Sequence, residues 1–337
     1  MRKPKRVHRF ALLVVGALAA WLVAVGKPSP DEDQPTIVKD SVQVTLVQSN
    51  GDQGWWPWIR YKVNGPIASG SQLYVEFAVP GKPWSRFDCK TGEIPKGHRW
   101  HVDCGVNSTG MEKPSALSTM VGPVGFQIKL RNELAGTDLT LFKGKAKLGK
   151  SPGKLGPYYV DEDWRIPIGY VYYEKDNSHG GETYLHVGFW YRGNPPDIEA
   201  HLFYQGKDIA KFKQAGNGAG DYKPSKPQWG YADCQFLGVY PTEPAEGQGY
   251  DPRFGIKSHP GDYEVKVLIV GHLARSIKFK VDADGQFDNG IGKANDLGIN
   301  HVIVPVKVVG NAETWDKAAW KTGAYYGNPL TGFTPEP

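Results

Sequence analysis

Cysteine is scarce in this sequence: Cys89, Cys104 and Cys234 are the only three among 337 residues. Small secreted scaffolds without a sizeable core depend on dense disulfide bridging, so that class is excluded. Cys89 and Cys104 bracket a turn at 91–97, and we expect them to form a disulfide in an oxidising compartment. Cys234 is then left over, either as a buried free thiol or as half of an intermolecular bridge.

Net charge is also lacking once the N-terminus is set aside. The chain carries 40 Lys and Arg against 35 Asp and Glu, and five of those cations lie in residues 1–26 without any acid. The remainder therefore holds 35 residues of each sign. Binding to nucleic acid relies on an excess of basic side chains facing the phosphates. Nucleic acid is accordingly not an expected partner.

Long apolar runs are absent except for residues 10–26, FALLVVGALAAWLVAVG, which follow a basic segment. This order of segments is typical of a secretory signal. Its 17 residues are also just long enough to cross a bilayer of about 30 Å. We therefore expect residues 1–26 to be a signal peptide or an uncleaved N-terminal anchor, followed by a disordered linker at 27–39. In both cases the rest is extracytoplasmic (periplasmic, cell-surface or secreted), and only residues 10–26, if retained, contact a membrane.

Helical periodicity is almost absent after residue 40, and apolar and polar residues alternate instead. Examples are VQVTLV at 42–47, WIRYKV at 58–63, FQIKL at 126–130 and YEVKV at 263–267. Such alternation indicates half-buried antiparallel strands. Short strands in a chain with 42 glycines and 26 prolines predict β-sandwiches rather than an α/β sheet.

The two halves of the sequence resemble each other at an offset that grows slowly along the chain. The matching pairs are LYVEFAVPGK at 73–82 with IEAHLFYQGK at 198–207, Asp-Cys at 103–104 with Asp-Cys at 233–234, and GFQIKL at 125–130 with DYEVKV at 262–267. One fold duplicated with loop insertions would give this pattern. We predict two tandem β-sandwiches at 40–147 and 165–283, joined by a linker at 148–164.

The segment GDYEVKVLIVGHLARSIKFKV at 261–281 resembles the last hairpin of bacterial immunoglobulin-like domains, with a weaker copy at 125–143. The resemblance implies a fold and no activity. The predicted fold class is therefore all-β, with two tandem immunoglobulin-like antiparallel β-sandwiches. A C-terminal extension at 284–337 is expected to add a strand at 301–309 and a short helix at 312–321. We expect it to pack on the second domain, or else to dock on another chain.

Two catalytic motifs overlap at one place, and both lack the required context. GKAKLGKS at 144–151 matches the P-loop pattern, and GKSPG at 149–153 matches the nucleophile elbow of serine hydrolases. Each motif works only where a helix follows a strand directly. The next residues, SPGKLGP, hold two prolines and two glycines, which oppose a helix. No catalytic residue is therefore predicted here.

Tryptophan is concentrated in GWWPW at 54–58. Exposed rings of Trp55 and Trp56, together with Tyr61, would form a stacking platform for polysaccharide. The competing interpretation is structural, with Trp58 at the start of a strand in the core and the other two tryptophans covering the end of the sandwich.

A cluster of acids in DADGQFDN at 282–289 offers Asp282, Asp284 and Asp288 as oxygen ligands for Ca²⁺. The spacing is not that of an EF-hand, because the glycine is at the fourth position and no Glu stands at the twelfth. An ordinary Asp-Gly turn is the alternative. No other cofactor is indicated. A second acidic run, at 161–163, is expected to be a solvated part of the linker.

No motif has both the residue spacing and the surrounding secondary structure that its chemistry requires. The predicted function is therefore that of an exported, non-catalytic cell-envelope protein with a structural or protein-interaction role, whose partner is another envelope protein or a second copy of itself. Two alternatives remain open: a carbohydrate-binding module that uses Trp55 and Trp56, and a glycan-processing enzyme whose acidic residues are dispersed.

Overall fold

The computed structural model describes residues 34–48, 54–79, 82–107, 110–111, 118–153, 156–215, 223, 227–251, 253–288, 301–310, 315–317 and 332–334. The predicted signal or anchor at 1–26 lies outside these residues. Within the described part, the regular elements are β-strands and three single-turn 3-10 helices. The prediction of an all-β fold is confirmed. Among the same residues, no helix has the length and apolar character needed to cross a membrane.

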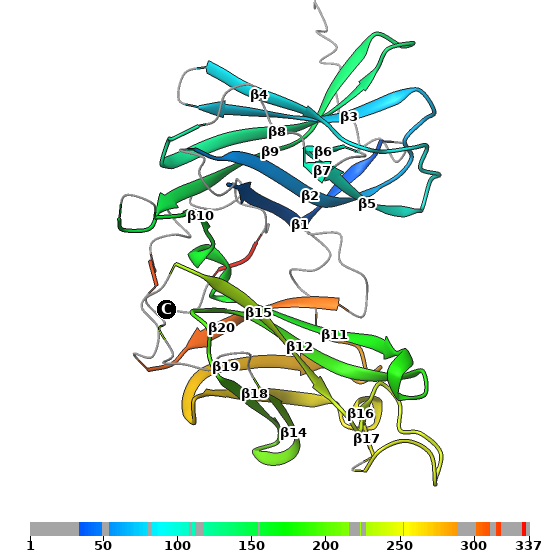
Figure 1. The fold of residues 1–337 in the computed structure, drawn as a ribbon. Helices are drawn as coiled ribbons and strands as arrows, with labels where there is room; N and C mark the ends of the chain where they lie inside the picture. The colour runs from blue at the N-terminus through cyan, green and yellow to red at the C-terminus, as the bar shows by residue number, and fades with distance from the viewer. Residues whose placement is uncertain are drawn as a thin grey trace, which may run out of the picture.

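The first unit, β1 to β10, has two main sheets that lie face to face (Figure 1). One sheet has the order β1 (Thr36–Val47), β2 (Trp56–Asn64), β5 (Arg99–Cys104). The other has the order β10 (Tyr158–Asp161), β9 (Thr137–Lys150), β8 (Gly122–Asn132), β3 (Ser71–Val79), β4 (Lys82–Asp88). The short strands β6 (Val106–Asn107) and β7 (Gly110–Met111) pair with each other. This unit is a β-sandwich.

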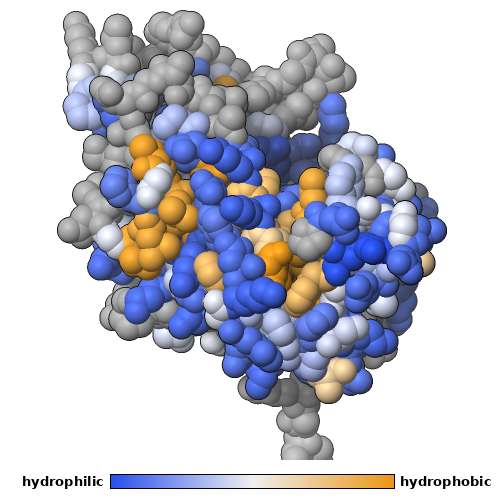
Figure 2. Space-filling model, turned by 90° about the horizontal axis from the view of Figure 1, so that it is seen from below, coloured by the Kyte–Doolittle hydropathy of each residue, from blue (hydrophilic) through white to orange (hydrophobic). Residues whose placement is uncertain are grey.

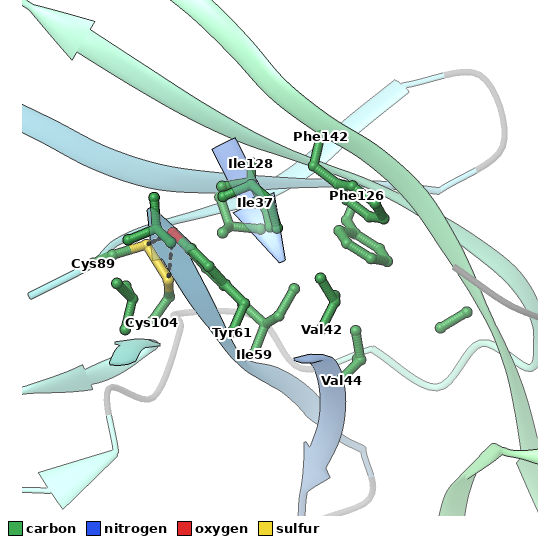
Figure 3. Packing of buried hydrophobic residues seen from close by; sticks show 14 of the residues in the cluster. Ile37, Val42, Val44, Ile59, Tyr61, Cys89, Cys104, Phe126, Ile128 and Phe142 are labelled. Atoms are coloured by element: carbon green, nitrogen blue, oxygen red, sulfur yellow. Dashed lines mark hydrogen bonds between the residues drawn. A yellow bond between two sulfur atoms is a disulfide. The ribbon is translucent and has the colours of Figure 1, made fainter. Parts of the chain in front are cut away.

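The core of the first unit follows from the alternation in its strands. In Figure 3, Val42 and Val44 of β1 and Ile59 of β2 lie opposite Phe126 of β8 and Phe142 of β9. In the central parts of β1, β2 and β8, buried side chains alternate with more exposed ones, because successive residues of a strand point to opposite faces. Burial of the apolar side chains supplies the main driving force for closing the sandwich.

The second unit, β11 to β20, contains one eight-stranded antiparallel sheet that is almost closed on itself, since its edge strands β14 and β15 contact each other. The order is β14 (Lys207–Ala215), β13 (Asp197–Tyr204), β18 (Gly261–Ile269), β19 (His272–Val281), β20 (His301–Val308), β11 (Ile168–Asp176), β12 (Glu182–Arg192), β15 (Trp229–Phe236). The strands β16 (Val239–Tyr240) and β17 (Phe254–Gly255) form a small parallel pair. Seen from below in Figure 2, the molecule is mainly hydrophilic, with apolar side chains in separate patches.

Strand pairing repeats from one unit to the other. The order β4-β3-β8-β9 in the first unit matches β14-β13-β18-β19 in the second, and β1-β2-β5 matches β11-β12-β15. The units differ in the last strand. β20 pairs with both β19 and β11 and so joins the two sheets into one, whereas β10 forms a ladder with β9. The internal repeat of the sequence therefore corresponds to a repeated strand topology.

Several expected boundaries are displaced. β1 begins at Thr36, inside the segment predicted as a linker at 27–39. Most of the segment 148–164 is also structured, because β9 continues to Lys150 and β10 adds a strand at its edge.

The C-terminal extension contacts both units rather than the second alone. Its strand β20 belongs to the second sheet. Beyond it, Asp316 forms an ion pair with Lys147 of β9 at 3.5 Å, and Phe333 is buried in the core of the first unit. The helix predicted at 312–321 falls mainly outside the described residues.

Candidate functional site

The overlapping P-loop and nucleophile-elbow motifs lie on a strand. Residues 144–150 belong to β9, and the described residues after it form a bend and then β10, not a helix. The glycines of the motif serve packing: a Cβ at Gly144 would collide with the rings of Phe126 and Phe142, and one at Gly149 with the ring of Tyr159. Neither a phosphate cradle nor a nucleophile elbow is formed.

The predicted sugar platform is buried. Trp55 and Tyr61 are 0% exposed and Trp56 is 4% exposed. The indole of Trp55 donates a hydrogen bond to the carbonyl oxygen of Met120 at 3.0 Å, and the hydroxyl of Tyr61 lies against Cys89 Sγ at 3.6 Å (Figure 3). None of the three rings offers a face on which a sugar could stack. The expectation of an exposed platform at these residues is wrong, because all three side chains are buried in the core of the first unit.

The three aspartates proposed for Ca²⁺ form a turn. Asp282, Asp284 and Asp288 are exposed. Asp282 Oδ1 accepts hydrogen bonds from the backbone amides of Asp284 and Gln286, both at 2.9 Å. Gly285 follows with φ at +78°, a backbone conformation that glycine adopts without strain. The carboxylate of Asp282 therefore stabilises an Asp-Gly turn, the alternative to a Ca²⁺ site that we considered from the sequence.

The cysteines differ in state. Cys89 and Cys104 are joined by a disulfide that lies beside the buried ring of Tyr61 (Figure 3). Cys234 of β15 is a buried free thiol. Burial, with a smaller contribution from the neighbouring Asp233 carboxylate, raises the pKa of the Cys234 thiol well above its ordinary value. A thiol in this state is a poor nucleophile.

The acidic run at 161–163 is buried, contrary to the expectation of a solvated linker. It belongs to a connector, residues 161–165, that passes between the units, and its carboxylates have basic partners. Asp161 pairs with Lys147 at 3.2 Å and Glu162 with Arg165 at 2.7 Å. Buried carboxylates persist where such partners and hydrogen bonds replace water.

Asp163 is the most enclosed acid of the connector, at 2% exposure. Its carboxylate accepts hydrogen bonds from Trp229 Nε1 at 2.8 Å, Arg192 Nη1 at 3.1 Å and the backbone amide of Asp316 at 2.7 Å. Burial raises its pKa, and these donors oppose that rise. The donors come from β12, β15 and the C-terminal segment, so Asp163 fixes the connector to the second unit.

A cleft of about 700 Å³ lies beside this connector, between the two units. The first unit contributes polar side chains to it, and the second contributes mostly aromatic ones. Its lining includes Asp40, Lys62, Tyr172, Trp190, Tyr231 and His301. Aromatic surface and polar groups converge in this cleft, which is typical of a binding site.

Three rings form a row on the sheet beside the cleft, and two of them, Tyr172 and His301, line it. Tyr172 of β11 pairs in register with His301 of β20 on one side and with His186 of β12 on the other. The Tyr172 ring is stacked on His186, with centroids 5.2 Å apart, and lies 5.0 Å from His301. These residues share the outer face of the sheet because directly paired residues of antiparallel strands point the same way.

A second aromatic group adjoins this row. The ring of Tyr231 lies over Gly188, where any Cβ would collide with it, and contacts Tyr170 and Trp190 at 6.0 Å and 5.6 Å between centroids. Tyr231 remains 41% exposed. Gly188 is thus the residue that allows a flat tyrosine ring at this position of the sheet.

Burial shifts the pKa values of three groups that line the cleft. Burial raises the pKa of Tyr172 and of Tyr231, whose hydroxyl groups also interact with each other. Burial also lowers the pKa of His301, which favours the neutral imidazole. The cleft therefore offers ring faces and hydrogen-bonding groups to whatever occupies it.

One edge of the cleft holds a group with metal-ligand chemistry. Glu174 lines the cleft, and one ligand atom from each of Glu174, His186 and Asp233 lies within 4.8 Å of the others. In the part of the chain that the structure describes, this is the one such trio of His, Cys, Asp or Glu residues. The aspartates of the 282–288 turn are not part of it.

The sequence contains only an indirect signal for the cleft. Its residues come from six strands and the connector, so no local motif marks it. The signal is that Tyr170, Tyr172 and Trp190 occupy positions facing away from the second core, where alternation normally places polar residues. No model of a known protein family matches this chain, and comparison with curated proteins finds no significant match.

Proposed function

We propose that this chain is an exported, non-catalytic cell-envelope protein of two immunoglobulin-like domains, and that it binds a partner protein in the cleft between them. The strand order supports the domain assignment: β1-β2-β5 opposite β9-β8-β3-β4 corresponds to strands A-B-E opposite G-F-C-C′ of immunoglobulin-like sandwiches. The fold alone implies no chemistry, so the role rests on the cleft.

Two observations support export. The N-terminus reads as a basic segment followed by an apolar one. Cys89 and Cys104 form a disulfide, a bond that persists in oxidising compartments outside the cytoplasm.

The composition of the cleft carries the proposal of partner binding. Tyrosine, tryptophan and arginine are the residues most enriched at the energetic centres of protein interfaces. Here Tyr172, Trp190 and Tyr231 line one cavity, beside the buried Arg165. Such side chains contribute most to affinity when they are already ordered before binding.

The burial of Trp55, Trp56 and Tyr61 removes the observation that favoured carbohydrate binding. No second function is therefore advanced.

Co-purification tests the proposal. A C-terminally tagged chain is cross-linked in envelopes of the native host and its partners are identified by mass spectrometry, with Tyr231→Ala and Tyr250→Ala compared with the wild type. The two tyrosines are matched, with exposures of 41% and 43%. We expect one dominant protein partner, reduced about 30-fold by Tyr231→Ala, as for loss of an interface residue worth about 2 kcal/mol. Tyr250→Ala should leave the yield unchanged. Recovery of glycan without protein, or equal yields of the partner protein with both variants, would contradict the proposal.

A further inference from the structure

A trio of potential metal ligands crosses three neighbouring strands at the edge of the cleft. Glu174 lies on β11, His186 on β12 and Asp233 on β15. In the register of the sheet, His186 is opposite Tyr172 and Asp233 is opposite Gly188, so the three residues follow a diagonal across one face. Residues of one face on adjacent strands converge without any loop, which makes the arrangement rigid.

The second observation concerns the imidazole of His186. The residue is 6% exposed, and its Nδ1 lies 3.1 Å and 3.2 Å from the two carboxylate oxygens of Asp233. Its Nε2 is buried and has no hydrogen-bond partner among the described residues. Buried polar atoms are nearly always satisfied, so an exception requires an explanation.

A second histidine of the same unit provides the contrast. His201 also lies between two carboxylates, with Nδ1 2.7 Å from Asp208 and Nε2 3.0 Å from Glu199. Both of its ring nitrogens have partners, and it belongs to no trio of metal-ligating residues in the described chain. His186, by comparison, has Nδ1 beside the Asp233 carboxylate and an Nε2 without a partner among the described residues, and it belongs to such a trio.

The outer contacts of the trio would hold its ligands in place. The ring of Tyr172 is stacked on that of His186 at an angle of 23°. The Tyr172 hydroxyl also interacts with the Asp233 carboxylate. Metal sites rely on such outer partners to fix the orientation of imidazole and carboxylate ligands.

We infer that Glu174, His186 and Asp233 bind a divalent transition-metal ion of the Zn²⁺ class. One imidazole and two carboxylates suit Zn²⁺ and its first-row neighbours, whereas Ca²⁺ and Mg²⁺ prefer oxygen ligands alone. Glu174 lines the cleft and is exposed, and the Asp233 side chain is 36% exposed, so an ion can reach the three residues from solvent. The inference does not depend on the protein-binding role proposed above.

Calorimetric titration of the metal-free full chain with Zn²⁺ tests the inference. We expect one ion per chain in the wild type. Glu174→Gln and Asp233→Asn should each weaken binding at least about tenfold, the lower end of what loss of even an outer partner costs a metal site. Both side chains are partly exposed, so these variants keep the test valid if His186→Gln fails to fold. His201→Gln is the matched control and should bind as the wild type does.

Co²⁺ gives an independent readout. Bound in place of Zn²⁺, it should produce the visible absorption of a low-coordinate ion in the wild type and in His201→Gln, and lose it in Glu174→Gln. Absence of one-to-one binding by either ion would overturn the inference. Binding that survives Glu174→Gln and Asp233→Asn unchanged would overturn it equally, because the ion would then be held elsewhere.

Discussion

The guanidinium of Arg165 donates a hydrogen bond to the carbonyl oxygen of Val42 at 2.9 Å, from the connector to β1 of the first unit. The same guanidinium lies over the ring of Trp190 of the second unit, 4.8 Å from its centroid, and pairs with Glu162 at 2.7 Å. One buried side chain therefore contacts both units and the segment between them. This contact and those of Asp163 hold the walls of the cleft in a fixed relation.

The first prediction follows from this contact. Arg165→Met removes the buried ion partner of Glu162, and breaking a buried pair typically costs about 3–5 kcal/mol. We expect the free energy of unfolding in urea to fall by that amount. Arg86→Ala is the control, because Arg86 pairs with Asp88 at the surface, where an ion pair contributes about 1 kcal/mol or less. If the two substitutions lowered the free energy of unfolding equally, the contacts of Arg165 would not stabilise the fold more than a surface ion pair does.

The second prediction concerns the disulfide. Cys89→Ala with Cys104→Ala opens a loop with a sequence separation of 15 residues, and should lower the free energy of unfolding by about 3 kcal/mol. Dithiothreitol should destabilise the wild type and Cys234→Ala alike and leave the double variant unaffected. A reductant effect that persists in the double variant would contradict the assignment of the bridge.

The third prediction concerns the reactivity of Cys234. Since burial raises the pKa of its thiol, little nucleophilic thiolate forms at neutral pH in the folded chain. We expect no reaction with Ellman's reagent under native conditions and one thiol per chain in denaturant. Rapid labelling of the native protein would mean that β15 opens readily or that the thiol is accessible.

The fourth prediction uses Gly188 to alter the cleft without touching the core. Its Cβ would collide with the far end of the Tyr231 side chain, which can swing away at little cost to the fold. Gly188→Ala should therefore reduce recovery of the protein partner about tenfold, equivalent to about 1.4 kcal/mol, with little change in thermal stability. Gly92→Ala, whose Cβ would meet nothing within 4 Å, should change neither quantity. Full recovery with Gly188→Ala would argue against a role for the Tyr231 ring.

The fifth prediction is a pH dependence. Burial lowers the pKa of His301 below its ordinary value of 6.5, so the unfolded chain takes up this proton at higher pH than the folded chain. The free energy of unfolding should therefore decline as the pH falls below 6.5 and stop declining, for this group, below the folded pKa. His301→Gln should flatten that part of the profile. An unchanged slope in the variant would assign the effect to other groups.

The strands and their repetition were predictable because they depend on local alternation. Val42, Val44 and Phe126 occupy the core positions that a period of two assigns to them. The resemblance between 73–82 and 198–207 likewise corresponds to equivalent hairpins, β3-β4 and β13-β14.

The cleft and the connector were not predictable, because they depend on contacts between distant segments. Asp163 reads as part of a polar run, yet it is buried by partners 29, 66 and 153 residues away. Trp55 is compatible with either a surface or a core position, and a hydrogen bond to Met120, 65 residues away, accompanies its burial. No local pattern contains such information.

Site-specific photo-cross-linking tests the central claim most directly. A benzophenone amino acid is placed at position 231, in the cleft, or at position 250, which has the same residue type and similar exposure outside it. Illumination of envelopes of the native host should yield one discrete protein adduct from position 231 and none of the same mass from position 250. No adduct from position 231, or the same adducts from both, would contradict the claim that a partner protein occupies the cleft.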